Sequence, residues 1–326
     1  MGSTHLQGLA RIPGAQLTAV MDMDTRRLSG DLSGIQGNLG GPGAAMDFSA
    51  VAKHPTVEGI LADPNVDAVD ICLPTHLHAP VAMAALRAGK HVLVEKPMAL
   101  NGADADAMCT QAEAAGRILM VAQVLRFIPA YRELARLVKS GDLGAVRWAM
   151  FRRRTSVPTW GPWEFDKTKS GGGIYDLLIH DVDMALQLFG TPASISAAGY
   201  EDMPHGIDMI TAEFCYPEVG SVSITGGWHH TGEYPFSMEY TVVADRGVVE
   251  FSSAGRPASV YWSDGRKEVL PGEGPDCYQA EIAYFVECCE RGEQPALCPP
   301  RESAEAVKCA LRMLEARERK GAAVAC

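Results

Sequence analysis

The first third of the chain alternates short apolar runs with segments of helical composition. The apolar runs span residues 17–21, 68–73, 91–94 and 118–123. Residues 79–88 and 103–115 have the composition of helices, and each is followed by a glycine suited to ending a helix, Gly89 or Gly116. Strands that alternate with helices form a parallel sheet covered on both faces. The alternation therefore predicts a doubly wound α/β domain.

The pattern changes after about residue 124, where runs typical of β-strands begin to dominate. These runs read AVRWAMFRRR, SISAAGY, DMITAEFCY, GSVSITGGW, MEYTVVA, GVVEF and ASVYWS. Helical patterns accompany them at about 129–139, 173–188, 278–290 and 302–319. Turn residues such as Asp245-Arg246-Gly247 connect neighbouring runs, as they do in antiparallel hairpins. We expect an α/β domain over residues 1–123, then an α+β domain over residues 124–326 with a large, mostly antiparallel, open-faced sheet.

Composition narrows the range of partners. The net charge of -11 argues against nucleic acid, because phosphate binding needs a basic face. No apolar run is long enough to span a bilayer, and the first residues lack the apolar core of a signal peptide. Nine scattered cysteines contain no C-x-x-C, so neither a structural zinc site nor another metal is expected. We expect a cytoplasmic protein with reduced thiols and no membrane partner. Its open sheet face favours a homodimer or homotetramer.

The tripeptide Glu95-Lys96-Pro97 directly follows the apolar run at 91–94. Ligands of open α/β sheets bind at the carboxyl ends of strands, so a lysine at this place can reach a substrate hydroxyl. The proline stiffens the turn that presents the lysine. A strand that ends in a solvated charge pair is the alternative interpretation, and this tripeptide alone leaves both open.

A glycine loop, Gly171-Gly172-Gly173, leads into the helix predicted at 173–188. Asp176 and His180 lie four residues apart, so they share one face of that helix. The carboxylate can orient the imidazole and favour its protonated form, which makes His180 a general acid–base candidate near pH 7. The alternative is a surface ion pair without a catalytic role.

Together these motifs resemble the family of glucose–fructose oxidoreductases and inositol dehydrogenases, often called Gfo/Idh/MocA. Its members typically read T-P-x-x-x-H, a helix with A-G-K-H-V, E-K-P, and later G-G-G-x-x-x-D-x-x-x-H. This chain has Leu73-Pro74-Thr75-His76-Leu77-His78, then A-G-K-H-V at 88–92 and both later motifs. Leu73 replaces the usual Thr or Ser. The resemblance covers nearly the whole chain except its beginning.

The resemblance implies a Rossmann-type domain and hydride transfer between a nicotinamide cofactor and a CH–OH group of a sugar, inositol or related polyol. It implies that His180 takes the hydroxyl proton, Asp176 orients His180, and Lys96 holds the substrate oxygen and stabilises its developing charge. The cofactor supplies the redox chemistry. Two alternatives stay open. Some members hydrolyse glycosides with a transiently used NAD, and a catalytically silent dinucleotide-binding or regulatory protein is also consistent with the sequence.

Asp22 bears on the choice of cofactor, because it follows the apolar run at 17–21. An acid at the end of the second strand of a dinucleotide fold accepts hydrogen bonds from the adenosine ribose and repels a 2′-phosphate. We therefore expect NAD, with NADP less favoured, since Arg26 and Arg27 lie near enough to pair with a phosphate. The other expected cofactor-binding residues are Gly2, Pro74, Thr75, His78, Glu95, Lys96, Gln123, Arg126 and Trp163.

Several of these features also have a structural interpretation. Arg126 suits capping and packing at a domain junction as well as a cofactor contact. The loop Trp160-Gly161-Pro162-Trp163 presents aromatic surface to nicotinamide or sugar, or it anchors a core. Arg152-Arg153-Arg154 favours a strand that exposes alternate charges over an anion site, and the glycine-rich stretch at 34–43 is expected to be a loop.

The beginning of the chain departs from the family pattern, which opens with a strand and G-x-G-x-x-G. Residues 1–6, MGSTHL, instead read as the last glycine of that fingerprint running into its helix. The first strand of a doubly wound sheet lies between the second and fourth strands, so two unpaired strand edges are expected in the sheet centre. We expect Met1 to be an internal methionine of a longer reading frame, with a strand and G-x-G-x encoded just upstream. Translating the upstream DNA tests this expectation.

Overall fold

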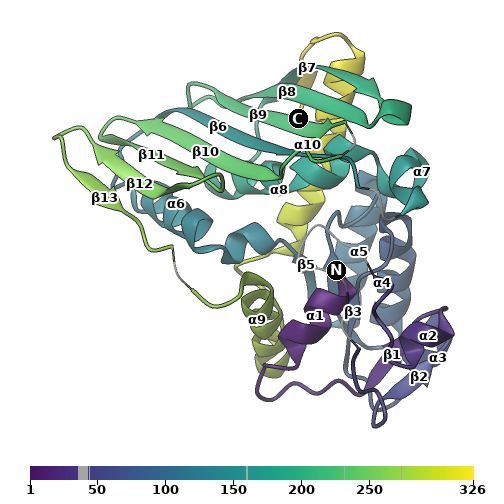
Figure 1. Cartoon of the computed structure of the whole chain (residues 1–326). Helices are drawn as coiled ribbons and strands as arrows, with labels where there is room; N and C mark the ends of the chain where they lie inside the picture. Colours follow the sequence, from purple (N-terminus) through teal and green to yellow (C-terminus); the bar gives the residue numbers. More distant parts are fainter. Residues whose placement is uncertain (36–42, 44, 159–160, 231, 273) are drawn as a thin grey trace. The chain divides into compact units, whose positions relative to one another are not determined.

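The computed structural model describes residues 1–35, 43, 45–158, 161–230, 232–272 and 274–326. They form two compact units, whose elements are labelled in Figure 1. Unit 1 comprises Met1–Ala99, Ala103–Ala122 and Pro275–Arg301, and unit 2 comprises Leu100–Gly102, Gln123–Gly274 and Glu302–Cys326. Most of the glycine-rich stretch at 34–43, and Trp160, lie outside the described residues. No helix in the described part of the chain is long and apolar enough to cross a membrane.

Unit 1 is built on parallel strands. Strands β3 (Ala68–Ile71), β4 (His91–Glu95) and β5 (Leu119–Ala122) pair in that order, and β1 (Ala19–Met21) pairs separately with β2 (Ala52–His54). The side chains of Val92, Leu93, Val94, Leu119 and Met120 are fully buried. The apolar runs at 91–94 and 118–123 therefore form strands buried on both faces, as parallel strands usually are.

Helices cover these strands. They are α1 (Gly2–Leu9), α2 (Thr25–Leu28), α3 (Val57–Ala62), α4 (His78–Arg87), α5 (Gly102–Ala115) and α9 (Cys277–Arg291). Helix α4 packs on β3 and β4, whereas α9 packs on α1 and reaches β4 from the other side (Figure 1). Gly8 permits the close approach of α1 and α9, because a Cβ there would lie 3.1 Å from Ile282 and 3.4 Å from the backbone of Gln279.

Strands β1 and β3 each keep one unpaired edge. Among the described strands, β1 pairs only with β2, and on β3 only β4 is paired, as the sequence analysis predicts. Both strands line a cavity of about 310 Å³. Its walls are largely apolar and include Leu6 and Leu9 of α1, Val20 of β1, and Val69 and Ile71 of β3.

Unit 2 holds a nine-stranded sheet in the order β13-β12-β11-β10-β6-β9-β8-β7-β14. The strands are β6 (Val146–Thr155), β7 (Ser194–Asp202), β8 (Ile207–Cys215), β9 (Val222–His229), β10 (Ser237–Ala244), β11 (Gly247–Ser252), β12 (Arg256–Trp262), β13 (Lys267–Val269) and β14 (Val324–Ala325). Neighbours run antiparallel except β6 and β9, which are parallel. Burial alternates along β8, as expected where one face of a sheet is covered.

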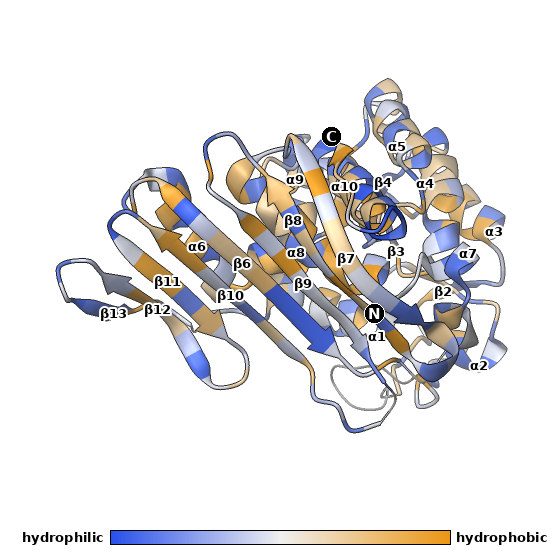
Figure 2. Cartoon of the chain, turned by 90° about the horizontal axis from the view of Figure 1, so that it is seen from above, coloured by the Kyte–Doolittle hydropathy of each residue, from blue (hydrophilic) through white to orange (hydrophobic). Residues whose placement is uncertain are grey.

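Helices cover one face of this sheet, so the predicted open-faced arrangement is confirmed. The helices of unit 2 are α6 (Pro129–Ser140), α7 (Lys167–Ser170), α8 (Gly173–Phe189) and α10 (Pro300–Glu318). Short 3-10 turns lie at η2 (Val124–Phe127) before α6, at η3 (Pro162–Phe165) before α7 and at η4 (Met203–His205) between β7 and β8. Figure 2 looks onto the sheet, with α6 and α8 behind it and hydrophilic and hydrophobic residues interleaved along the strands. Large apolar side chains that remain exposed on these strands include Trp148, Tyr200 and Met209.

Candidate active site

Lys96 directly follows the buried strand β4. It is half-buried, whereas Val94, Glu95 and Pro97 around it are buried. The backbone N–H of Lys96 donates to Oε2 of Glu95 at 3.1 Å, which helps to fix the turn. Lys96 is therefore the residue of the E-K-P turn with side-chain surface that a ligand can reach.

The ring of His78 connects the E-K-P turn to the segment after β3. Its Nδ1 lies 2.8 Å from the carbonyl oxygen of Pro97, and its Nε2 lies 2.7 Å from that of Leu73. Burial lowers the pKa of His78, although both carbonyl contacts oppose this shift. The side chain is 1% exposed, and its two contacts hold the E-K-P turn against the segment that follows β3.

His5 of α1 links the ends of β3 and β4. Its Nδ1 lies 2.8 Å from Oδ2 of Asp70, and its Nε2 lies 3.0 Å from Oε1 of Glu95. Burial alone lowers the pKa of His5, but the Asp70 carboxylate and Cys72 outweigh it and raise that pKa well above its ordinary value. Burial likewise works to raise the pKa of Glu95, but His5 outweighs burial and holds that pKa low. The raised pKa of His5 favours its charged form beside the carboxylate that accepts the Lys96 N–H.

A metal ion is an alternative partner for part of this cluster. Ligand atoms of His5, Asp70 and Cys72 lie within 4.8 Å of one another, a spacing that metal ligands also adopt. The carboxylates of Asp70 and Glu95 already pair with the two ring nitrogens of His5. The cluster is therefore explained without a metal.

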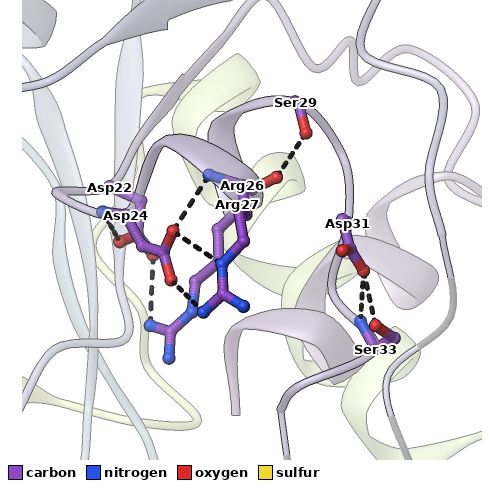
Figure 3. A network of polar contacts seen from close by, with 7 residues as sticks. All are labelled: Asp22, Asp24, Arg26, Arg27, Ser29, Asp31 and Ser33. Atoms are coloured by element: carbon purple, nitrogen blue, oxygen red, sulfur yellow. Dashed lines mark hydrogen bonds and ion pairs between the residues drawn. The ribbon is translucent and has the colours of Figure 1, made fainter.

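Asp22 follows β1 in an exposed polar network (Figure 3). Its Oδ1 accepts the N–H of Asp24 at 2.8 Å, and its Oδ2 lies 3.4 Å from Nη1 of Arg27. Asp24 caps α2 by accepting the N–H of Arg26 at 2.9 Å, and the hydrogen-bonded side chain of Arg26 lowers the pKa of Asp24. Carboxylates and guanidinium groups therefore lie side by side after β1, so a ribose hydroxyl and a phosphate would both find a partner there.

Helix α8 begins in a glycine loop with little room for side chains. Gly171 and Gly172 have φ angles of 83° and 95°, which glycine adopts more readily than other residues. A Cβ on Gly173 would lie 2.3 Å from the indole ring of Trp228 on β9. The three glycines therefore let the first turn of α8 pack directly against the sheet.

Asp176 and His180 are the two residues between Gly173 and Leu186 that are half-buried rather than buried. They lie one turn apart, so they share the strip of α8 that a ligand can reach. The sequence predicts this shared face, and the helix as a whole is buried rather than solvated.

Two buried ion pairs fasten α8 to the rest of unit 2. Arg126 of η2 donates from Nε and Nη2 to Asp183 at 2.8 and 2.7 Å. Arg153 of β6 donates from the same two atoms to Asp181 at 2.8 and 3.2 Å. Bidentate pairs fix orientation, and removing one partner of a buried pair costs roughly 3–5 kcal/mol. Asp181 and Asp183, which the sequence analysis missed, thus hold the helix that carries Asp176 and His180.

The three consecutive arginines of β6 alternate between the two sides of the strand. Arg153 binds Asp181, while Arg152 and Arg154 pair with Glu239 of β10 at 2.6 and 3.3 Å. The three arginines therefore lie on a strand, as predicted, and each pairs with a carboxylate.

Three more of the predicted cofactor residues lie near the end of β3 in unit 1. Gly2 begins α1, and a Cβ on it would lie 3.6 Å from the Cβ of Cys72, which follows β3. Pro74 precedes the short turn η1 (Thr75–Leu77), in which Thr75 is buried. The carboxyl ends of β3 and β4 thus carry five of the predicted residues: Pro74, Thr75, His78, Glu95 and Lys96.

Gln123 and Trp163 belong to unit 2. Gln123 follows β5, is 2% exposed, and donates from Nε2 to Oγ of Ser303 at 3.4 Å. Its Oε1 is buried and has no hydrogen-bond partner among the residues that the structure describes. A buried acceptor of this kind suits a bound group that offers an N–H or O–H. Trp163 lies half-buried in η3.

Comparison with known proteins decides the family. An oxidoreductase family with an NAD-binding Rossmann fold matches residues 1–123, and the Gfo/Idh/MocA C-terminal domain matches residues 131–250. Myo-inositol 2-dehydrogenase of Thermotoga maritima is 33% identical over 310 residues, which cover 91% of this chain and 87% of that protein. The chain belongs to the Gfo/Idh/MocA oxidoreductase family.

Other relatives of this Gfo/Idh/MocA protein fit the same assignment. The NAD(+)-dependent scyllo-inositol 2-dehydrogenase of Bacillus subtilis is 28% identical over 313 residues, covering 90% of this chain and 85% of that protein. An uncharacterised oxidoreductase of Rhizobium meliloti is 35% identical over 172 residues, so the matched segment spans about half of that relative (51%). Levoglucosan dehydrogenase in complex with NADH and levoglucosan has a TM-score of 0.84 at 19% identity, covering 100% of this chain and 96% of that chain, which shows the shared fold.

Proposed function

We propose that this Gfo/Idh/MocA protein is a dehydrogenase that transfers a hydride between NAD and a CH–OH group of a sugar, inositol or related polyol. The observation that carries the proposal is the setting of Lys96, Asp176 and His180. Each is half-buried among buried neighbours, at the places where the family motifs put them. Similarity to inositol dehydrogenases over most of the chain supports the substrate class.

In the proposed reaction, His180 takes the proton of the substrate hydroxyl during oxidation. Asp176, one turn away on α8, orients the imidazole and stabilises its charged form. The Lys96 ammonium group donates to the substrate oxygen and stabilises the negative charge that develops there. When bound, the nicotinamide cofactor supplies the hydride acceptor.

The residues that we propose to hold NAD fit a dinucleotide. They are Gly2, Asp22, Pro74, Thr75, His78, Glu95, Lys96, Gln123, Arg126 and Trp163. The helix N-terminus at Gly2 offers backbone N–H groups for an anion, and the buried Oε1 of Gln123 offers an acceptor. His78 and Arg126 are 1% and 2% exposed, so we propose that they contribute indirectly, His78 by holding the E-K-P turn and Arg126 by holding α8 through Asp183.

We further propose a division of labour along the chain. Residues 1–123 bind the dinucleotide, and residues 124–326 bind the substrate and mediate self-association as a homodimer or homotetramer. Exposed apolar side chains on the sheet of unit 2, such as Tyr200 at 58% exposure, support this role. We place the protein in the cytoplasm, and the nine cysteines, all described and outside disulfides, support that location. Light scattering of the purified protein tests the oligomer.

The cofactor preference gives a testable prediction. We expect wild-type protein to favour NAD over NADP. Asp22→Ser should lower the ratio of kcat/KM with NAD to kcat/KM with NADP by about tenfold, or about 1.4 kcal/mol. The carboxylate that repels a 2′-phosphate is then gone, while Arg27 remains beside the site. Asp31→Ser, which removes an exposed carboxylate that accepts a hydrogen bond from Ser33, is the control and should leave the ratio unchanged. A wild-type preference for NADP would contradict the assignment and make Arg26 or Arg27 the phosphate ligand.

A panel of polyols tests the function itself. The protein is mixed with NAD and myo-inositol, scyllo-inositol or levoglucosan, and NADH is followed by its absorbance. The proposal expects net NADH with at least one polyol. Release of free sugar from an aryl glycoside without net NADH would indicate a glycoside hydrolase instead. Dinucleotide binding by fluorescence titration, without either reaction, would indicate a catalytically silent binding protein.

A further inference from the structure

The side chain that caps the first turn of α8 comes from another element of unit 2. The residue at the cap position, Gly172, has no side chain to offer. In its place, Oδ2 of Asp208 on β8 accepts the backbone N–H of Ile174 at 3.0 Å. Asp208 is 1% exposed and lies 34 positions further along the chain. A strand residue therefore supplies the capping interaction for the helix that carries Asp176 and His180.

A second layer of charges holds Asp208 in place. Arg317 of α10 donates from Nη1 to Oδ1 of Asp208 at 2.7 Å and from Nη2 to Oε2 of Glu201 on β7 at 2.7 Å. Lys167 of α7 pairs with the same Glu201 carboxylate. Each oxygen of Asp208 thus has one partner, with Ile174 on one side and Arg317 on the other. The geometry of the cap is fixed by four elements of unit 2.

We propose that Asp208 is a positioning residue that sets the placement of Asp176 and His180 through the first turn of α8. The capped residue, Ile174, lies two positions before Asp176 and six before His180. The preceding glycines, Gly171 and Gly172, place little restriction on the backbone, so the first turn depends on packing and on this hydrogen bond. The inference rests on the proposed function, because it assigns Asp176 and His180 to the reacting centre.

Two substitutions at Asp208 distinguish the loss of the hydrogen bond to Ile174 from the loss of the carboxylate charge. Asp208→Ala removes both hydrogen bonds. In Asp208→Asn an NH₂ group replaces one of the two acceptor oxygens, so one of the two bonds is lost. The control is Asp276→Ala, which removes a similar cap from α9, where Asp276 accepts the N–H of Tyr278 at 3.0 Å. The control is expected to lower thermal stability, since caps contribute about 1 kcal/mol, without affecting the reacting centre.

The decisive readout is the titration of the His180 ring by NMR in the absence of substrate and cofactor. We expect Asp208→Ala to move the midpoint of that titration by about half a pH unit or more, because the turn of α8 that carries Asp176, four residues before His180, is no longer held in place. With the polyol that reacts, kcat is expected to fall at least about tenfold while KM changes by less than about threefold. Asp208→Asn is expected to give a smaller change in the same direction, and the Asp276→Ala control no change.

The outcomes distinguish this inference from the proposed function. If wild-type protein turns over no polyol, the proposed function fails, whereas the His180 titration still tests the positioning role. A folded Asp208→Ala variant with the wild-type titration midpoint and kcat would overturn the inference. So would an equal effect of Asp276→Ala. If Asp208→Ala does not fold, Asp208→Leu decides, because leucine fills the space of the aspartate but offers no acceptor to the N–H of Ile174. A wild-type midpoint in that variant is the contradicting result.

Discussion

Lys96→Met is expected to lower kcat by about 100- to 1000-fold, the effect of removing one preorganised donor from a developing oxyanion. Methionine keeps most of the length and volume of the side chain but has no ammonium group. Because the neighbouring contacts are made by Glu95, His78 and the backbone, the fold should persist. Dinucleotide binding should stay largely intact, since Lys96 is one of ten residues that we propose to hold NAD. Turnover by NADH absorbance and dinucleotide binding by fluorescence measure the two properties separately.

The matched control for this variant lies at the other end of the same strand. Lys90 precedes β4 and donates from Nζ to the carbonyl oxygens of Asp63 and Val66. Lys90→Met is expected to lower stability while turnover stays within about twofold of wild type, since the change lies outside the proposed site. Near-normal turnover in Lys96→Met, or an equal loss in both variants, would remove Lys96 from the mechanism.

His180→Ala is expected to lower the oxidation rate by about 100- to 10,000-fold, the usual contribution of a positioned general base. The wild-type rate should rise with pH through one ionisation, because only the neutral imidazole can accept the hydroxyl proton. That ionisation should be missing from the profile of the variant. The measurement is kcat/KM for the polyol across the pH range in which the protein stays folded.

An exposed histidine–aspartate pair provides the control. His205 lies 2.8 Å from Asp202, three residues earlier in the chain, and its side chain is 75% exposed. His205→Ala should leave both the rate and the pH profile unchanged. If His180→Ala keeps the wild-type profile and rate, the acid–base assignment is wrong and another group accepts the proton.

The strands could be predicted from the sequence where their burial is uniform. Residues 92–94 are all apolar because β4 is buried on both faces there, and the predicted strand at 91–94 matches β4 to within one residue. Strand β2 (Ala52–His54) was missed because its three residues carry no apolar pattern. It is a strand because its backbone pairs with β1, and such pairing leaves no signal in a short polar segment.

Within the candidate site, the sequence could predict only relationships between residues that lie close together in the chain. Asp176 and His180 share a helix face whatever the rest of the chain does, so their relationship follows from four residues of sequence. Arg126 and Asp183 are 57 positions apart, and His5 and Asp70 are 65 apart. Nothing in the sequence around either member of these pairs indicates its partner.

One signal for the missed ion pairs was nevertheless present. Asp181 and Asp183 alternate with apolar residues at 181–186, DVDMAL, and carboxylates are almost never fully buried without a partner. Their positions therefore indicated buried arginine partners, although not that these partners would be Arg153 and Arg126. The partner of a buried charge is set by the fold, which local patterns do not specify.

Hydride transfer between the polyol and the cofactor is the central claim, and isotope transfer tests it most directly. The protein is incubated with NAD and the reacting polyol carrying deuterium on carbon, and the reduced cofactor is analysed by mass spectrometry. The account predicts one deuterium in each NADH formed. With Lys96→Met or His180→Ala, labelled NADH should form at least about 100-fold more slowly than with the wild-type protein. Unlabelled NADH, or labelled NADH formed at the wild-type rate by both variants, would contradict it.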